Sequence, residues 1–170
     1  MLINLDSVPP FYKNYVKLIE ETDVLQALRL SGARTQLLVH SIPEAKADYR
    51  YADGKWTVRE VLAHMIDAER IFAYRALRFA RNDKTPLSGW DENEYAPYLN
   101  ASGRSLKKLG DEMVHLCATT VDLFESFTED MLARKGVANN NEMTVLVLGL
   151  VTAGHEAHHR KILAERYLAK

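Results

Sequence analysis

The 170-residue chain has little cysteine, little proline and glycine, and no excess of charge of either sign. The single cysteine, Cys117, excludes an intramolecular disulfide, which makes the reducing cytoplasm the expected compartment. The 22 basic and 23 acidic residues nearly cancel, so the chain lacks the positive field that nucleic-acid binding uses. We therefore expect a cytoplasmic protein that does not bind nucleic acid.

Long hydrophobic runs are also missing. The longest apolar stretch, residues 144–153, is too short to cross about 30 Å of hydrocarbon as a helix. The N-terminus has neither a basic region nor a sustained apolar segment, so no signal peptide is expected. The length and the 47% hydrophobic content are typical of one globular domain. The sequence predicts a single domain over residues 1–170 and no membrane partner.

Helical periodicity dominates the rest of the chain. The five prolines and eight glycines cluster in few places, and between them apolar residues recur at steps of three and four. Thr22 or Asp23 can cap a helix after a break in the first segment, and Thr57 with Glu60 forms a capping box. Four long helical segments are expected, at about 10–42 with a break near 21–23, 57–80, 103–127 and 143–168.

Residues 82–100 contain too many turn formers to be mostly helix and form a long crossover between the second and third helices. Four amphipathic helices with this connection predict an all-α, mainly antiparallel four-helix bundle. Trp90, Tyr95 and Tyr98 in the crossover can either floor a pocket or cover the bundle. Trp56, just before the Thr57 cap, is interpreted as a packing residue.

Three histidines are candidate metal ligands. His155 and His159 lie one turn apart and about 40° apart around the last helix, so both imidazoles can bind one ion. His64 lies at the inner edge of the apolar stripe of the second helix. Burying three unpartnered imidazoles costs roughly 1–3 kcal/mol each, whereas a divalent ion satisfies one nitrogen of every ring. The alternative is a solvated helix face whose imidazoles complement the dipole at the C-terminal end.

The residues around this histidine pair also limit what the motif can mean. His155, Glu156 and His159 match the letters of the zinc-metalloprotease motif, but no third ligand follows within the remaining eleven residues. We therefore discount a protease. His158 is offset by about 60° from His155, on the side opposite to His159, and is the expected bystander.

Three segments of the chain resemble the DinB superfamily, which includes the YfiT-like proteins. They are residues 56–69 (WTVREVLAHMIDAE), 87–95 (LSGWDENEY) and 154–160 (GHEAHHR). The resemblance implies a four-helix bundle, often dimeric, that holds a divalent metal by His64, His155 and His159 and leaves positions for water. Family members include thiol transferases that use bacillithiol or mycothiol, a mycothiol-dependent maleylpyruvate isomerase and proteins described as metal-dependent hydrolases.

A three-histidine site fits several metals, with zinc or nickel expected first and iron, manganese or copper as alternatives. Such an ion acidifies a bound water or thiol for attack on a small electrophile. Asp67 and Asp91 are candidates for contacts to the ligands or the substrate. The competing hypothesis is a non-catalytic bundle that binds metal or a small ligand in a structural or sensor role. That hypothesis predicts a fourth protein ligand, with His158 or Asp67 the first candidates.

Overall fold

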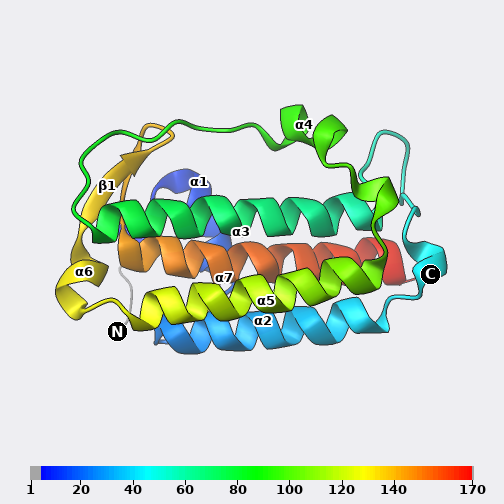
Figure 1. Cartoon of the computed structure of the whole chain (residues 1–170), viewed down its shortest axis with the longest axis horizontal. Coiled ribbons are helices and arrows are strands. Elements are labelled where there is room, and N and C mark those ends of the chain that lie inside the picture. Colours follow the sequence, from blue (N-terminus) through cyan, green and yellow to red (C-terminus); the bar gives the residue numbers. More distant parts are fainter. Residues whose placement is uncertain (1–4, 170) are drawn as a thin grey trace.

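The computed structural model describes residues 5–169, and its long helices form a four-helix bundle (Figure 1). The described chain also contains single turns of 3-10 helix and a π-helical turn, Leu163–Leu168, that continues the last helix. The helices and strands, in chain order, are α1 (Pro10–Val16), α2 (Val24–Ser41), α3 (Val58–Ala80), α4 (Glu92–Tyr95), α5 (Leu106–Glu125), α6 (Glu129–Ala133), β1 (Lys135–Ala138), β2 (Asn141–Thr144) and α7 (Val145–Ile162).

The bundle consists of α2, α3, α5 and α7, and each helix packs against two neighbours. Both α2 and α3 pack against α5 and α7, so α2 and α3 lie diagonally opposite. In Figure 1, α2 and α7 run in one direction and α3 and α5 in the other, because the crossover returns the chain along the whole bundle. The pairs α2–α5 and α3–α7 are therefore antiparallel, as expected, while α2–α7 and α3–α5 are parallel.

The helix starts follow the capping signals of the sequence. Asp23 caps α2, accepting a hydrogen bond from the amide of Gln26 at 2.8 Å. The capping box of α3 is complete: Thr57 Oγ1 accepts from the Glu60 amide at 3.2 Å, and the Glu60 carboxylate accepts from the Thr57 amide at 2.7 Å. Both capping residues therefore lie where the sequence predicted the helix starts.

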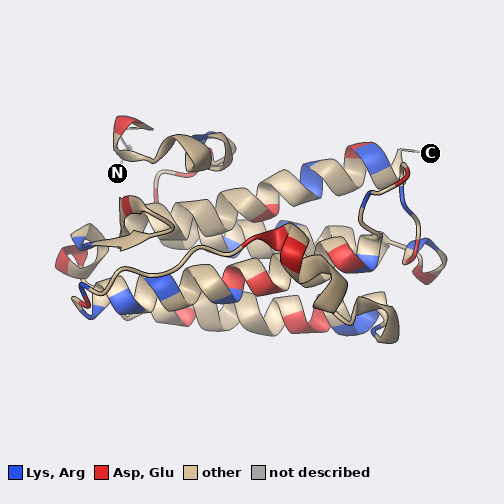
Figure 2. Cartoon of the chain, turned by 90° about the horizontal axis from the view of Figure 1, so that it is seen from above, with Lys and Arg blue, Asp and Glu red and all other residues tan. Residues whose placement is uncertain are grey.

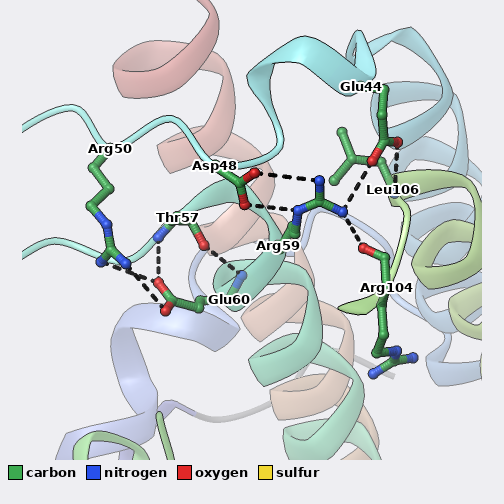
Figure 3. Close-up of polar contacts among 8 residues, drawn as sticks. All are labelled: Glu44, Asp48, Arg50, Thr57, Arg59, Glu60, Arg104 and Leu106. Atoms are coloured by element: carbon green, nitrogen blue, oxygen red, sulfur yellow. Dashed lines mark hydrogen bonds and ion pairs between the residues drawn. The ribbon is translucent and has the colours of Figure 1, made fainter. Parts of the chain in front are cut away.

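Arg59 joins this end of α3 to two neighbouring segments (Figure 3). Its guanidinium pairs with Asp48 at 2.9 Å and with Glu44 at 3.0 Å, and donates to the carbonyl oxygen of Arg104. Glu44 also accepts from the amide of Leu106, the first residue of α5, at 2.9 Å. The start of α3, which carries His64 two turns later, is thereby fixed to α5.

A short hairpin precedes α7 and is an element that the all-α prediction omitted. Strands β1 and β2 pair antiparallel, with Ala138 opposite Asn141. Asn139 and Asn140 between them have φ of 49° and 58°, the left-handed conformation of a two-residue type I′ turn. Leu87 of the crossover bonds to this hairpin, donating to Val137 at 2.9 Å and accepting from Asn139 at 3.0 Å. The hairpin thus holds the crossover in place.

Helix α1 lies against α7 because α7 offers a glycine at the contact. A Cβ added to Gly154 would lie 2.3 Å from the carbonyl oxygen of Tyr15, so a larger residue would displace α1. The close approach places Tyr15 beside the histidines of α7.

Charge is spread rather than segregated on the molecule. Figure 2 shows both signs distributed along the bundle helices and an acidic short helix, α4, in the crossover. Within residues 5–169, no helix has the length and apolar character needed to cross a membrane.

Candidate metal centre

The structure brings His64 of α3 together with His155 and His159 of α7. The Nε2 atom of His155 lies 3.1 Å from that of His64 and 3.1 Å from that of His159. One ligand nitrogen from each ring falls within 4.8 Å of the other two. Helix α3 packs against α7 over its length, so residues separated by about ninety positions in sequence converge on one point.

Burial keeps these imidazoles neutral. Burial, followed by the charge of His158, lowers the pKa of His64 to about 4. Burial and the neighbouring histidines hold the pKa of His155 and of His159 well below the ordinary value. At neutral pH each ring therefore carries one nitrogen lone pair, which is the form that binds a metal.

Aromatic rings surround the three imidazoles. The centroid of His64 lies 4.9 Å from that of Trp56 and 5.6 Å from that of Trp90. His155 meets Tyr15 edge-on at 5.4 Å and Phe72 at 5.7 Å. These rings exclude bulk water from the sides of the site, which strengthens electrostatic interactions within it.

The histidines open into a cavity of about 220 Å³. Trp56 packs against the core that contains Val61, as predicted, and it also lines this cavity. Of the crossover aromatics, Trp90 lines the cavity with Tyr95 against it at 5.4 Å, whereas Tyr98 is 86% exposed. The pocket alternative therefore holds for Trp90, whereas Tyr98 neither lines this cavity nor covers the bundle.

Several cavity residues were not predicted from the sequence. Tyr12 and Tyr15 come from α1, whose position depends on packing against Gly154. Arg75 lies three turns after His64 on α3, and Glu92 begins α4. A helical count of eleven residues from His64 to Arg75 would have placed both on one face, since eleven steps of 100° return to within about 20°.

Neither aspartate proposed for site contacts lines the cavity. Asp67 faces Arg70, 3.4 Å away on the outer side of α3. Asp91 caps α4, accepting from the amide of Asn93 at 2.8 Å. Glu92, the residue after Asp91, is the carboxylate that lines the cavity, and contacts of Asp67 or Asp91 to ligands or substrate stay a prediction.

His158 lines the cavity but stands apart from the convergent nitrogens. Its ring meets Tyr15 at 5.3 Å and His159 at 5.1 Å, and it is not part of the group of ligand atoms. Burial, followed by the charge of Lys161, lowers its pKa. Among residues 5–169, no fourth histidine, cysteine or carboxylate joins the three ligand atoms.

Glu156 points away from the histidines, into the bundle. Its carboxylate accepts from Thr35 Oγ1 at 2.7 Å and lies 3.8 Å from Arg160 Nη1. Burial, followed by the charge of Glu156, raises the pKa of the adjacent Glu69 well above its ordinary value, so the pair of carboxyl groups retains a proton. Glu156 cannot act as a protease base beside the histidines, which agrees with discounting that motif.

The histidine set meets the requirements of a divalent transition metal. Two nitrogens bound to one ion at about 2.0–2.1 Å and a tetrahedral angle would be separated by roughly 3.3 Å. The observed separations of 3.1 Å are close to this value. His159 Nδ1 is buried and has no hydrogen-bond partner among the described residues. Neutral rings whose Nε2 atoms face one another fit an ion better than a hydrogen-bonded core.

Comparison with known families agrees with this arrangement. The model of the DinB superfamily matches residues 27–163. The chain belongs to the DinB superfamily. No curated protein matches the sequence.

Two solved structures of this kind share the fold. YfiT from Bacillus subtilis, a "probable metal-dependent hydrolase with an unusual four-helix bundle topology", matches with a TM-score of 0.70 and 21% identity, over 84% of this chain and 85% of that one. A mycothiol-dependent maleylpyruvate isomerase matches with a TM-score of 0.65 and 15% identity, over 99% of this chain and 64% of that one. At 21% and 15% identity, these two likenesses establish the fold of this chain and nothing about its activity.

Proposed function

We propose that this DinB-superfamily protein is a metal-dependent enzyme in which His64, His155 and His159 hold one divalent ion. The convergence of three neutral imidazole nitrogens on the wall of a cavity is the observation that carries the proposal. The description of YfiT as a "probable metal-dependent hydrolase" supports it. Zinc and nickel are the first candidates, and iron, manganese and copper also suit imidazole ligands.

A catalytic site needs a free coordination position, and the arrangement of the donors favours one. Among the described residues, three histidines supply the converging ligand atoms, and the same histidines line a cavity of about 220 Å³. A structural zinc site is closed by four protein ligands. When bound, the ion supplies Lewis acidity that lowers the pKa of a coordinated water or thiol.

The residues around the three histidines set the protonation state and the water content of the proposed site. Burial keeps the ligand rings unprotonated, Trp56 and Trp90 restrict the water around His64, and Tyr15 supports the ring of His155 from the edge. The cavity is large enough for about seven water molecules at about 30 Å³ each, so it accommodates a small molecule.

The reaction that we propose is attack by an activated low-molecular-weight thiol, or by water, on a small electrophile. The mycothiol-dependent isomerase among the structural neighbours supports a thiol cosubstrate, and YfiT supports hydrolysis. A homodimer and a cytoplasmic location remain predictions from the sequence. The second candidate is a non-catalytic metal- or ligand-binding bundle, which the nearby ring of His158 favours because it is the residue closest to serving as a fourth ligand.

An activity screen tests this proposal. Wild type and His159→Ala are offered low-molecular-weight thiols with electrophilic acceptors, alongside ester and amide substrates, with and without a chelator. We expect turnover by the metal-loaded wild type and loss of turnover in both the variant and the chelated protein. Turnover that survives both treatments contradicts the proposal, and a wild type that binds metal but turns over nothing favours the non-catalytic bundle.

A further inference from the structure

Arg75 is a buried cation without a carboxylate partner. Its residue is 3% exposed, and no ion pair joins it to an acidic group among residues 5–169. Its Nη2 donates to the carbonyl oxygen of Ser88 at 2.9 Å, and it hydrogen-bonds the hydroxyl of Tyr12. Both partners are neutral. Arginine is rarely buried without a paired charge, so this guanidinium lacks the anion that its position calls for.

The guanidinium lines the same cavity as the three histidines. Arg75 and His64 lie on one face of α3, with about 16 Å between their positions along the helix axis. Helical side chains point toward the N-terminus of their helix, which directs Arg75 back toward His64. One ligand in the cavity can therefore meet the histidine end and the arginine end.

Other groups at this end of the cavity fit a small oxygen anion. The hydroxyl of Tyr12 lies beside the guanidinium, and burial raises its pKa against the opposing charge and hydrogen bond of Arg75, so it remains a neutral donor. The side chain of Asn139 also lines the cavity, on the hairpin that tethers the crossover. Glu92 is the one carboxylate of the cavity lining, and it stays beyond ion-pair distance of Arg75.

We propose that the cavity binds a small molecule that carries a carboxylate, and that Arg75 binds this carboxylate. The guanidinium offers two parallel N–H donors, which match the two oxygens of a carboxylate. This inference rests on the proposed function, because it names the class of substrate or cosubstrate for that site. Arg75 is a binding residue and takes no part in bond making.

Succinate and its neutral diamide, succinamide, are suitable probes because they differ in charge and little in shape. The two tryptophans of the chain, Trp56 and Trp90, both line the cavity, so their fluorescence reports its occupation. We expect the wild-type protein, as purified, to bind succinate at least tenfold more tightly than succinamide. Equal affinities, or no binding of succinate at high millimolar concentration, overturn the proposal without any variant.

Variants then locate the bound carboxylate. Arg75→Met keeps an unbranched apolar stem and removes the charge, and we expect it to weaken succinate binding by about tenfold or more, the effect of losing a charged hydrogen bond. Arg70→Met is the matched control on the same helix, where Arg70 pairs with Asp67 and Glu112 outside the cavity. Unchanged succinate affinity in Arg75→Met overturns the proposal.

The metal function and the carboxylate site can fail separately. Metal content of His159→Ala reports on the metal function, whereas the difference between wild type and Arg75→Met in succinate binding reports on the carboxylate site. Circular dichroism verifies that Arg75→Met is folded. If it is not, the comparison of succinate with succinamide on the chelated wild type decides the question, because no metal ion is then present to bind the carboxylate.

Discussion

Two clusters of buried titratable groups lie on opposite sides of α7, and successive residues of that helix belong to different clusters. His155 faces His64 and a cavity, whereas Glu156 faces Thr35, Arg160 and a second carboxyl group inside the bundle. The histidine Nε2 atoms lie beside one another, and His159 Nδ1 has no hydrogen-bond partner among the described residues. Glu156 is already satisfied by a hydroxyl and by the nearby charge of Arg160.

The difference shows what separates a candidate site from a polar core. Both clusters bring three potential metal ligands within 4.8 Å of one another, namely the three histidines in one and Glu69, Cys117 and Glu156 in the other. All three histidines line one cavity of about 220 Å³. The void beside both Cys117 and Glu156 measures about 10 Å³, and a larger hollow of about 410 Å³ is lined by Cys117 but by neither Glu69 nor Glu156. Proximity of ligand atoms is common to both clusters, whereas among the described residues a cavity lined by all three ligand residues is found at the histidines and not at the second cluster.

The largest effect is expected from removing a histidine of the cavity. His64→Ala or His159→Ala removes one of three metal bonds, and we expect metal affinity to fall by more than the roughly 10–100-fold typical of losing a supporting residue. His158→Ala is the matched control, because its ring lies outside the ligand group. Metal content by elemental analysis checks this, and equal loss in His158→Ala would reveal a fourth ligand.

A smaller and different effect is expected on the other side of α7. Glu156→Ala leaves Arg160 and Thr35 without their buried partner, and we expect a loss of about 2–3 kcal/mol in the free energy of unfolding. Urea denaturation measures this loss. Glu156→Gln, which still accepts from Thr35, should lose less. Metal stoichiometry should be unchanged in both variants, and its loss in Glu156→Gln would contradict the separation of the two clusters.

The two clusters should also give opposite slopes of stability against pH in the metal-free protein. The pKa of His64 falls to about 4 on folding, so the unfolded chain binds more protons and stability is lost as pH drops from about 6.5 to 4, by up to about 3 kcal/mol. The raised pKa of Glu69 has the opposite sign, so its contribution is present below about pH 4.5 and is lost as pH rises.

Variants assign each slope to its cluster. The free energy of unfolding is measured across pH by denaturant titration. His64→Gln should reduce the loss of stability as pH falls from about 6.5 to 4, and Glu69→Gln should reduce the loss of stability as pH rises above about 4.5. A profile that Glu69→Gln leaves unchanged would show that this carboxyl group ionises normally in the folded protein.

The sequence was a good guide where local signals determine structure. Asp23 and the Thr57–Glu60 box set the starts of α2 and α3, and the spacing of His155 and His159 places both on one face of α7. The apolar stripe of the second helix made His64 the third candidate, the resemblance to the DinB superfamily implied the same ligand, and the structure brings the three together.

Features that depend on distant contacts were missed for a physical reason. Tyr15 reaches His155 only because Gly154 lets α1 approach α7, and no spacing within residues 10–16 indicates that contact. The hairpin strands are short and lack clear alternation, although consecutive asparagines at Asn139 and Asn140 are compatible with the left-handed turn that joins them. The parallel helix pairs likewise follow from the path of the crossover rather than from any local pattern.

X-ray absorption spectroscopy of the zinc-loaded protein tests the central claim most directly. We predict about three histidine nitrogens at about 2.0–2.1 Å from zinc, with the imidazole outer-shell scattering retained in Glu69→Gln and diminished in His64→Ala. Zinc–sulfur scattering at about 2.3 Å, or a carboxylate shell without imidazole, would place the ion on Cys117 and the glutamates and contradict the account.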